Sequence, residues 1–227
     1  MEKEVRIGMK DTHKVKISPS ILSADFSNLE RSVKAVKNTE WLHLDVMDGH
    51  FVPNLTFGPC IIESIRDKSE HVFDTHLMIS KPDKYIDDFV EAGSDIITFH
   101  VEAVDDIEKL IEDIKKTGTK VGLSLKPGTM FETIEEFLPY IDLILIMTVE
   151  PGFSGQEFME EVVPKIKEAR YAVDERNYDI DIAVDGGISP ETAGTVVDNG
   201  ANVLVSGSSV FEGDIEKNLK GLRKAVE

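Results

Sequence analysis

Histidine and aspartate alternate within an apolar segment near residue 45, where a buried strand would normally carry neither. The segment reads WLHLDVM over residues 41–47, so His43 and Asp45 lie two positions apart. Side chains two apart on a β-strand point to the same face, so we expect both to project to one side of a sheet. An imidazole and a carboxylate on one face are suited to binding a divalent metal ion.

Two more potential metal ligands lie at the ends of other apolar segments. His76 ends the segment VFDTH, and Asp185 ends the segment IDIAVD. With His43 and Asp45 they form a set of two imidazoles and two carboxylates, which suits Zn²⁺, Fe²⁺, Mn²⁺ or Co²⁺. A strand histidine taken singly is more often a hydrogen-bonded core residue than a metal ligand, so it is the combination that predicts a metal site.

These residues belong to a regular alternation of β-rich segments with helical patterns. The β-rich segments are VKISPSI, WLHLDV, VFDTHLM, DIITFHV, KVGLSL, DLILIMTV, IDIAVD and NVLVSG. They are apolar on both faces, as expected of a parallel sheet covered by helices. Eight such units in a chain of 227 residues predict an α/β fold, the (β/α)8 TIM barrel. Active sites of such barrels lie at the carboxyl ends of the strands, where the four candidate ligands occur.

Helical periodicity occupies the segments between the strands. Apolar residues recur at helical spacing in the ranges 28–36, 83–91, 105–116, 133–138, 158–175 and 191–198. We expect residues 16–227 to form a single catalytic barrel domain. Residues 1–15 are expected to be an N-terminal extension, within which Met9 is an alternative start.

Three glycine-rich segments follow the last three strands. They read EPGFSGQ at residues 150–156, VDGGIS at 184–189 and VSGSSVF at 205–211. Backbone amides in such loops, with a short helix after the eighth strand, form the phosphate site of many barrels. The expected donors are Gly186, Gly187, Gly207 and Ser208. The substrate is therefore predicted to be a small phosphate ester.

The composition limits the classes of molecule that the chain is expected to bind. A formal net charge of -18 argues against nucleic acid or an anionic membrane surface, because both are bound mainly through lysine and arginine. Cys60 is the only cysteine, which excludes an intramolecular disulfide and fits a cytoplasmic location. No apolar stretch approaches the length of a membrane span. A small-molecule partner remains.

The other histidines and the cysteine are expected to have structural roles. His50 and His100 are interpreted as a loop residue and a residue behind the ligands. His13 and His71 are expected to be exposed to solvent, and Cys60 to be a packing residue.

From Lys16 onward the chain resembles the ribulose-phosphate 3-epimerase family. The matching motifs are ISPSILSADF, HLDVMDGHFVPN, HLM, FHVE, MTVEPGFSGQ, VDGGI and VSGSSVF. The resemblance implies a barrel of the ribulose-phosphate-binding type and an isomerase of the pentose phosphate pathway, which interconverts D-ribulose 5-phosphate and D-xylulose 5-phosphate. It also implies a cytoplasmic homo-oligomer, either a dimer or a hexamer. One departure is Ser154, which stands where many relatives have glycine.

The resemblance further implies how the candidate ligands would act. His43, Asp45, His76 and Asp185 would hold one divalent ion per subunit, and the two aspartates would also be the catalytic acid and base. Inverting C3 of a ketose phosphate removes a proton beside the C2 carbonyl and returns it on the other face, which two carboxylates can do through an enediolate.

The same resemblance implies roles for further residues. Those that would cap the intermediate are Met47, Met78 and Met147, although core packing explains methionines at these positions equally well. Those that would contact the substrate are Ser20, His43, His76, Gly152, Phe153, Ser154, Gly155, Asp185, Gly186, Gly187, Gly207 and Ser208.

Three alternative functions are weighed against this interpretation. Barrel lyases that decarboxylate phosphorylated acids carry an Asp-x-Lys-x-x-Asp motif on a strand, whereas the corresponding LDVMD lacks lysine. A non-catalytic phosphate-binding barrel would not need four charged or ligating residues in its mouth. An epimerase acting on allulose 6-phosphate is a closer alternative, although VDGG, FHVE and ILSADF are more similar to the pentulose enzyme.

Overall fold

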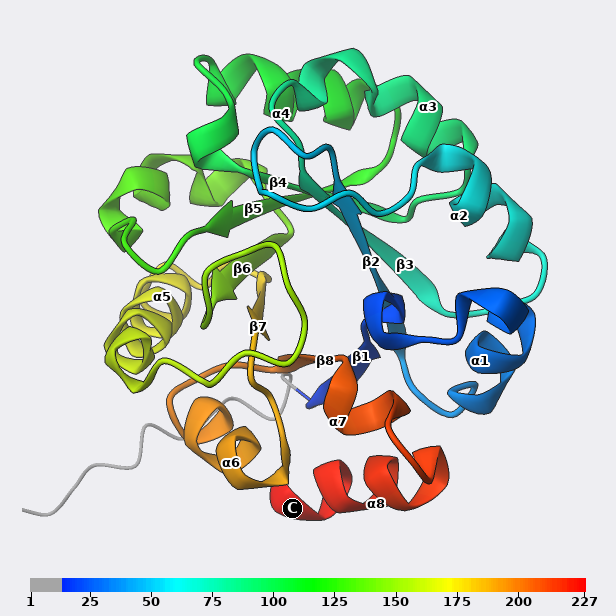
Figure 1. Ribbon diagram of the computed structural model, residues 1–227. Coiled ribbons are helices and arrows are strands. Elements are labelled where there is room, and N and C mark those ends of the chain that lie inside the picture. The colour runs from blue at the N-terminus through cyan, green and yellow to red at the C-terminus, as the bar shows by residue number, and fades with distance from the viewer. Residues whose placement is uncertain (1–13) are drawn as a thin grey trace, which may run out of the picture.

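A ring of parallel strands surrounded by helices makes up the fold (Figure 1). The computed structural model describes residues 14–227. Its 8-stranded sheet has the order β1-β8-β7-β6-β5-β4-β3-β2, and all neighbouring strands are parallel. A single bridge between Ser20 and His43 joins β1 to β2 and closes the ring. The predicted (β/α)8 barrel is confirmed.

Each strand coincides with one of the segments expected from the sequence, although β2 extends one residue beyond WLHLDV to Met47. The strands are β1 (Lys16–Pro19), β2 (Trp41–Met47), β3 (Val72–Met78), β4 (Ile96–His100), β5 (Lys120–Leu125), β6 (Leu143–Met147), β7 (Asp181–Asp185) and β8 (Val203–Ser206). Residues 1–13, which include Met9 and His13, lie outside the described residues.

The helices cover the outside of the ring. The α-helices are α1 (Leu29–Ala35), α2 (Pro59–Arg66), α3 (Ile86–Glu91), α4 (Ile107–Lys116), α5 (Val163–Glu175), α6 (Pro190–Asp198), α7 (Ser208–Phe211) and α8 (Ile215–Ala225). Short 3₁₀ helices are η1 (Ile21–Ser23), η2 (Phe26–Asn28), η3 (Pro82–Lys84), η4 (Val101–Ala103) and η6 (Glu160–Val162). A longer one is η5 (Phe131–Tyr140).

Three helical segments differ from the expectation. The pattern at residues 133–138 lies in η5, a 3₁₀ helix with Pro139 inside it, and proline cannot donate the backbone hydrogen bond of an α-helix. Helices α2 and α8 were not among the six predicted ranges, although both carry apolar residues at helical spacing that face the core, such as Ile62 and Leu222.

The interior of the barrel is filled unevenly. An apolar cluster takes most of its residues from β6–β8, such as Leu143, Leu145 and Val203, and includes Trp41 of β2 and Ile96 of β4. The opposite half is polar, and its fully buried side chains on β2–β4 are His43, Asp74, His76, Thr98 and His100. Gly122 on β5 makes room for one of them, because a Cβ there would lie 2.3 Å from Thr98 Oγ1. Buried polar groups require hydrogen-bond partners, so this half must contain a connected network.

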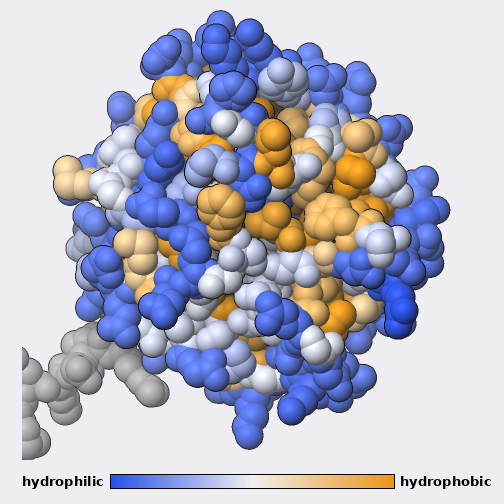
Figure 2. Space-filling model, viewed as in Figure 1, coloured by the Kyte–Doolittle hydropathy of each residue, from blue (hydrophilic) through white to orange (hydrophobic). Residues whose placement is uncertain are grey.

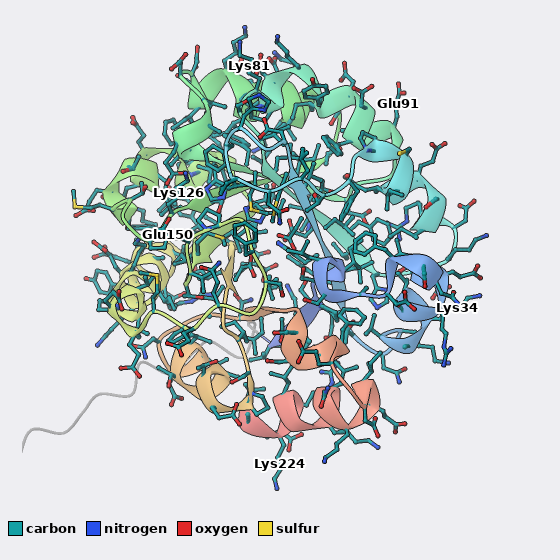
Figure 3. The ribbon with its side chains drawn as sticks, in the orientation of Figure 1. Lys34, Lys81, Glu91, Lys126, Glu150 and Lys224 are labelled. Atoms are coloured by element: carbon teal, nitrogen blue, oxygen red, sulfur yellow. The ribbon has the colours of Figure 1, made fainter. Side chains whose placement is uncertain are left out.

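Hydrophilic side chains cover most of the outer surface, whereas hydrophobic ones gather toward the middle of the face in Figure 2. Charged residues such as Lys34 and Lys224 project outward from the helices (Figure 3). Within residues 14–227 no helix is long and apolar enough to span a membrane.

Two structural expectations from the sequence are wrong. His71 is 6% exposed, and its ring contacts the Val36 carbonyl at 3.0 Å and the Ser69 hydroxyl. Hydrogen bonding at both ring nitrogens explains why this polar residue is buried. Cys60 is exposed on α2 and is therefore no packing residue.

Candidate active site

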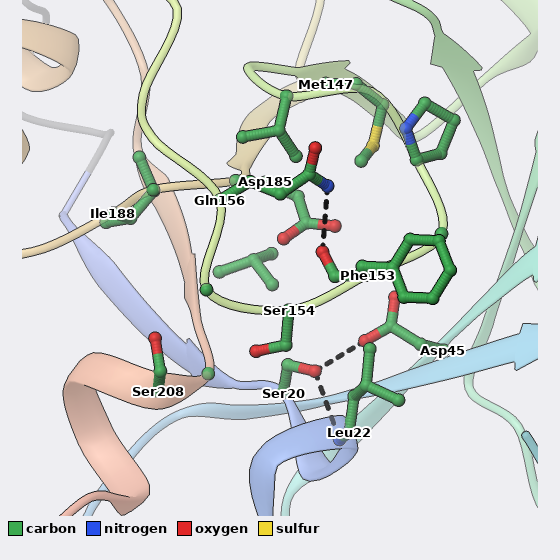
Figure 4. Close-up of a pocket in the computed structure, with 18 of the residues that line it drawn as sticks. Ser20, Leu22, Asp45, Met147, Phe153, Ser154, Gln156, Asp185, Ile188 and Ser208 are labelled. Atoms are coloured by element: carbon green, nitrogen blue, oxygen red, sulfur yellow. Dashed lines mark hydrogen bonds between the residues drawn. The ribbon is translucent and has the colours of Figure 1, made fainter. Parts of the chain in front are cut away.

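A pocket opens at the carboxyl ends of the strands (Figure 4). Ten of the twelve predicted substrate-binding residues line it, namely Ser20, Gly152, Phe153, Ser154, Gly155, Asp185, Gly186, Gly187, Gly207 and Ser208. The other two, His43 and His76, are completely buried behind the carboxylates. Lining residues that were not predicted include Leu22, Gln156 and Ser209. Leucine, glutamine and serine are common in loops throughout the sequence, so their residue types did not mark these positions as part of a binding site.

The four predicted metal ligands converge beside this pocket. One side-chain atom from each of His43, Asp45, His76 and Asp185 lies within 4.8 Å of the others. Asp45 Oδ1 is 3.3 Å from both His43 Nε2 and His76 Nδ1. Asp185 Oδ2 is 3.9 Å from the same two nitrogens, which are 3.3 Å apart.

These separations fit a small divalent ion. Bonds of about 2.0–2.2 Å to nitrogen and oxygen, directed tetrahedrally, place neighbouring ligand atoms about 3.3 Å apart. Two neutral imidazoles and two carboxylates are also the donor types that Zn²⁺ and related ions prefer. The cluster could therefore hold one metal ion with small movements of Asp185.

A second group of buried side chains orients the first ligand. His43 Nδ1–H donates to Asp74 Oδ2 over 2.9 Å, and Thr98 Oγ1–H donates to Asp74 Oδ1 over 2.6 Å. Such carboxylate–histidine pairs fix the ring and leave its other nitrogen free for a metal. Asp74 and Thr98 are not among the residues predicted from the sequence. The D-x-H spacing of Asp74 and His76, which repeats that of His43 and Asp45 in reverse, could have drawn attention to Asp74.

The two aspartates have opposite protonation preferences. Burial opposes ionisation of Asp45, but its contacts with His43 and His76 outweigh burial and lower its pKa. Burial and then the nearby charge of Asp45 raise the pKa of Asp185 to about 7. A pair of carboxyl groups held in different protonation states is the arrangement expected of a general base and a general acid.

The pKa values of the buried histidines are also shifted in opposite directions. Burial lowers the pKa of His43, yet the charges of Asp45 and Asp74 prevail, so its pKa is raised well above the ordinary value. For His76 burial is the dominant influence and its pKa is lowered. Burial also lowers the pKa of His100 to about 4, which keeps this third imidazole neutral.

Glycine-rich loops form the opposite wall of the pocket. Gly187 has φ +65°, and a Cβ there would lie 2.7 Å from the backbone of Phe158, so only glycine fits without strain. A Cβ at Gly207 would lie 2.6 Å from Ser23 Oγ. The close approach leaves backbone rather than side chains facing the pocket, as an anion site built from amide groups requires.

The loop after β6 contacts the other side of the pocket mouth. Ser154 Oγ is 2.7 Å from Ser23 Oγ, and Asn54 Nδ2 donates to the Gly152 carbonyl over 2.7 Å. Figure 4 shows Phe153 and Ser154 on the loop that crosses the view, with Asp185 on one side of it and Asp45 on the other. The three methionines expected to cap the intermediate also line the pocket, namely Met47, Met78 and Met147.

Solved structures resemble the fold at low sequence identity. A mutant tryptophan synthase α-subunit from Pyrococcus furiosus superposes with a TM-score of 0.69 and 15% identity, over 93% of this chain and 99% of that chain. Identity at this level shows the fold alone.

Curated relatives are much more similar in sequence. The ribulose-phosphate 3-epimerase of Bacillus subtilis is 46% identical over 213 residues, which are 92% of this chain and 98% of that protein. The protein of the same name from Synechocystis is 49% identical over 199 residues, 86% of either chain. A sequence model of the ribulose-phosphate 3 epimerase family matches residues 16–211. The chain therefore belongs to the ribulose-phosphate 3-epimerase family.

Proposed function

We propose that the chain interconverts D-ribulose 5-phosphate and D-xylulose 5-phosphate by two-base proton transfer at C3, through an enediolate. The observation that carries the proposal is the pair Asp45 and Asp185, which reach one pocket from β2 and β7 with pKa values shifted in opposite directions. Inversion at carbon needs a base on one face and an acid on the other. In one direction ionised Asp45 accepts the C3 proton and protonated Asp185 delivers a proton, and the reverse reaction exchanges these roles.

The ligand cluster has two functions in this proposal. A Zn²⁺, Fe²⁺, Mn²⁺ or Co²⁺ ion held by His43, Asp45, His76 and Asp185 would supply Lewis-acid stabilisation of the negative charge that develops on the C2 and C3 oxygens. Ser20 Oγ–H donates to Asp45 Oδ2 over 2.5 Å, so this carboxylate keeps a fixed orientation while its other oxygen faces the cluster.

The glycine-rich wall would bind the phosphate group. Gly186, Gly187, Gly207 and Ser208 lie together on this wall, where backbone N–H groups can reach an anion. The loop of Gly152 to Gly155 would cover the bound sugar, and its contacts to Ser23 and Asn54 would hold it closed over the pocket. Met47, Met78 and Met147 would exclude water from the reacting carbon and present polarizable sulfur to it.

The activity is tested by following the sugars directly. Purified chain, loaded with each of the four divalent ions in turn, is incubated with ribulose 5-phosphate, allulose 6-phosphate and unphosphorylated ribulose. Efficient conversion of ribulose 5-phosphate to xylulose 5-phosphate supports the proposal, since remote phosphate binding helps to orient the reacting carbon. Faster conversion of allulose 6-phosphate would show that this sugar is the preferred substrate. Equal efficiency with free ribulose would contradict the proposed phosphate-binding site.

The proposal extends to the state of the enzyme in the cell. We place it in the cytoplasm as a homo-oligomer, with support from a single cysteine, which suits a reducing compartment. Light scattering of the purified protein would measure the oligomer directly, and a monomer at micromolar concentration would contradict this part.

A further inference from the structure

His100 lies directly behind the metal-ligand candidate His76, on the next strand of the barrel. The two Nε2 atoms are 2.9 Å apart, and the rings are tilted by 30° with their centres 5.0 Å apart. At this distance one nitrogen must donate a hydrogen and the other must accept it. Which of them donates decides where the proton of His76 resides.

Glu102 settles the direction of this hydrogen bond. Its Oε2 atom is 3.0 Å from His100 Nδ1, and a carboxylate can only accept, so His100 Nδ1 carries a hydrogen. His100 is completely buried, where a neutral imidazole with a single N–H is favoured. The Nε2 atom of His100 is then the acceptor, and His76 Nε2 must be the donor.

The second carboxylate oxygen of Glu102 also accepts hydrogen bonds. Glu102 Oε1 accepts the backbone N–H of Lys126 over 2.8 Å and also a hydrogen bond from the Thr129 hydroxyl. Three donors therefore converge on this carboxylate, whose side chain is only 21% exposed. The ring of Phe51 packs against His100 with ring centres 4.8 Å apart and holds the imidazole in place.

From this geometry we infer that Glu102 and His100 are positioning residues, which hold His76 as the Nε2–H tautomer and leave the lone pair of Nδ1 facing the metal cluster. The inference rests on the proposed function for the identity of the cluster. Its consequence is that His76 is aligned and deprotonated at the ligand atom before any ion arrives. Outer hydrogen-bond partners of ligand histidines typically change metal affinity about 10- to 100-fold.

Replacing Glu102 by glutamine tests the direction of the relay without changing side-chain volume. The Lys126 N–H and the Thr129 hydroxyl both need an acceptor, so the amide oxygen is expected to stay with them and the NH₂ group to face His100 Nδ1. That nitrogen must then accept, which makes His100 Nε2 the donor and reverses His76 to the Nδ1–H tautomer. The variant Glu102→Gln should therefore switch the tautomers of both His100 and His76.

The measurement is long-range ¹H–¹⁵N correlation on the full chain labelled with ¹⁵N-histidine and freed of metal. His76 is assigned from the spectrum of His76→Gln. We expect the Nε2–H tautomer in the parent and the Nδ1–H tautomer in Glu102→Gln. The matched control is Ser124→Ala, because Ser124 Oγ is 3.4 Å from the same His100 Nε2 but is not needed by the relay. This control should leave the tautomer of His76 unchanged.

Metal affinity supplies the second readout. Competition with a chelator should show Zn²⁺ or Co²⁺ binding weakened about 10- to 100-fold in Glu102→Gln and unchanged in Ser124→Ala. His76 found as Nδ1–H in the metal-free parent would overturn the inference, and this observation does not depend on any variant folding. A parent that binds no divalent ion but shows the expected tautomers would instead overturn the proposed metal site and leave the relay standing.

Discussion

Asp45 and Asp185 stand on opposite sides of the strand ring, on β2 and β7, yet oxygen atoms of their carboxyl groups lie within 4.8 Å of each other. Neither could be ionised beside the other without cost, and the pKa of Asp185 is raised partly for this reason, after burial. His43 lies closer to Asp45 than to Asp185, at 3.3 Å against 3.9 Å, which favours ionisation of Asp45.

The first prediction separates the roles of the two aspartates. In D₂O, Asp185→Asn should lose net epimerisation by about 100- to 10,000-fold, because asparagine cannot transfer the proton. It should still exchange the C3 proton of the epimer that faces Asp45. Asp45→Asn should show residual exchange of the other epimer only.

Nuclear magnetic resonance of both sugars measures this exchange, with metal content determined in parallel so that loss of the ion is recognised. A variant that kept its metal and interconverted the sugars at the parental rate would show that its aspartate is no obligatory acid or base.

The second prediction concerns the role of His76. His76→Ala should lose tight metal binding and activity while remaining folded, since the ligand lies at the mouth of the barrel above the apolar layers. Because His76 is completely buried and hydrogen-bonded, we expect a loss of about 1–3 kcal/mol in the free energy of unfolding. Elemental analysis and denaturant titration measure the two effects.

His71→Ala is the matched control, because His71 is also buried and hydrogen-bonded but precedes β3 at the other end of the barrel. It should lose stability and keep its metal. Global unfolding of His76→Ala would instead indicate that His76 is a core residue.

The third prediction concerns the protons displaced by metal binding. In the metal-free protein the pKa of His43 is raised well above its ordinary value, and that of Asp185 is raised to about 7. Both groups hold protons at or below neutral pH. His43 must release its proton to bind an ion through Nε2, whereas Asp185 can bind through one oxygen while the other keeps the proton that catalysis uses. Metal affinity should therefore fall as the pH falls below 7, with protons released on binding at pH 7.

Calorimetry in buffers of different ionisation enthalpy counts these protons. Metal binding at pH 7 without proton release would contradict the assignment of His43 as a ligand.

The fourth prediction tests the phosphate wall. Gly207→Asp would bring a Cβ to within 2.6 Å of Ser23 Oγ and place a carboxylate beside the dianionic substrate. Two like unit charges 4 Å apart repel by about 4 kcal/mol near a protein surface, so kcat/KM for ribulose 5-phosphate should fall by at least about 100-fold. Gly128→Asp adds the same charge where a Cβ meets nothing within 4 Å, and it should retain activity. Equal effects of the two substitutions would argue against phosphate binding at Gly207.

The residues at the strand ends could be predicted because the fold concentrates chemistry there. Asp45, His76 and Asp185 lie at or within two residues of the ends of β2, β3 and β7, and His43 lies two positions before Asp45 on the same face. A parallel barrel brings these positions together. Asp74 could not be placed in the same way, because it lies inside β3 beside His43 of β2, and its role depends on Thr98 and His43 from neighbouring strands.

Partners that come from distant segments account for the other differences. His71 looked like a solvent-exposed residue, but its ring reaches the Val36 carbonyl across 35 positions of sequence. The relay from Glu102 through His100 was likewise invisible, because it depends on which nitrogen of each ring faces which neighbour.

The uneven filling of the barrel interior implies unequal rigidity of its two halves. The β6–β8 half is held by close-packed aliphatic side chains, whose contacts do not depend on an ion or on pH. The β2–β4 half carries three of the four candidate ligands, and its buried hydrogen bonds end at the ligand cluster, whereas β7 contributes Asp185 at its end. Amide hydrogen exchange should consequently accelerate in β2–β4 and at the end of β7 after chelation and stay slow in β6 and β8, so that the barrel would report its metal occupancy as a local opening of one side.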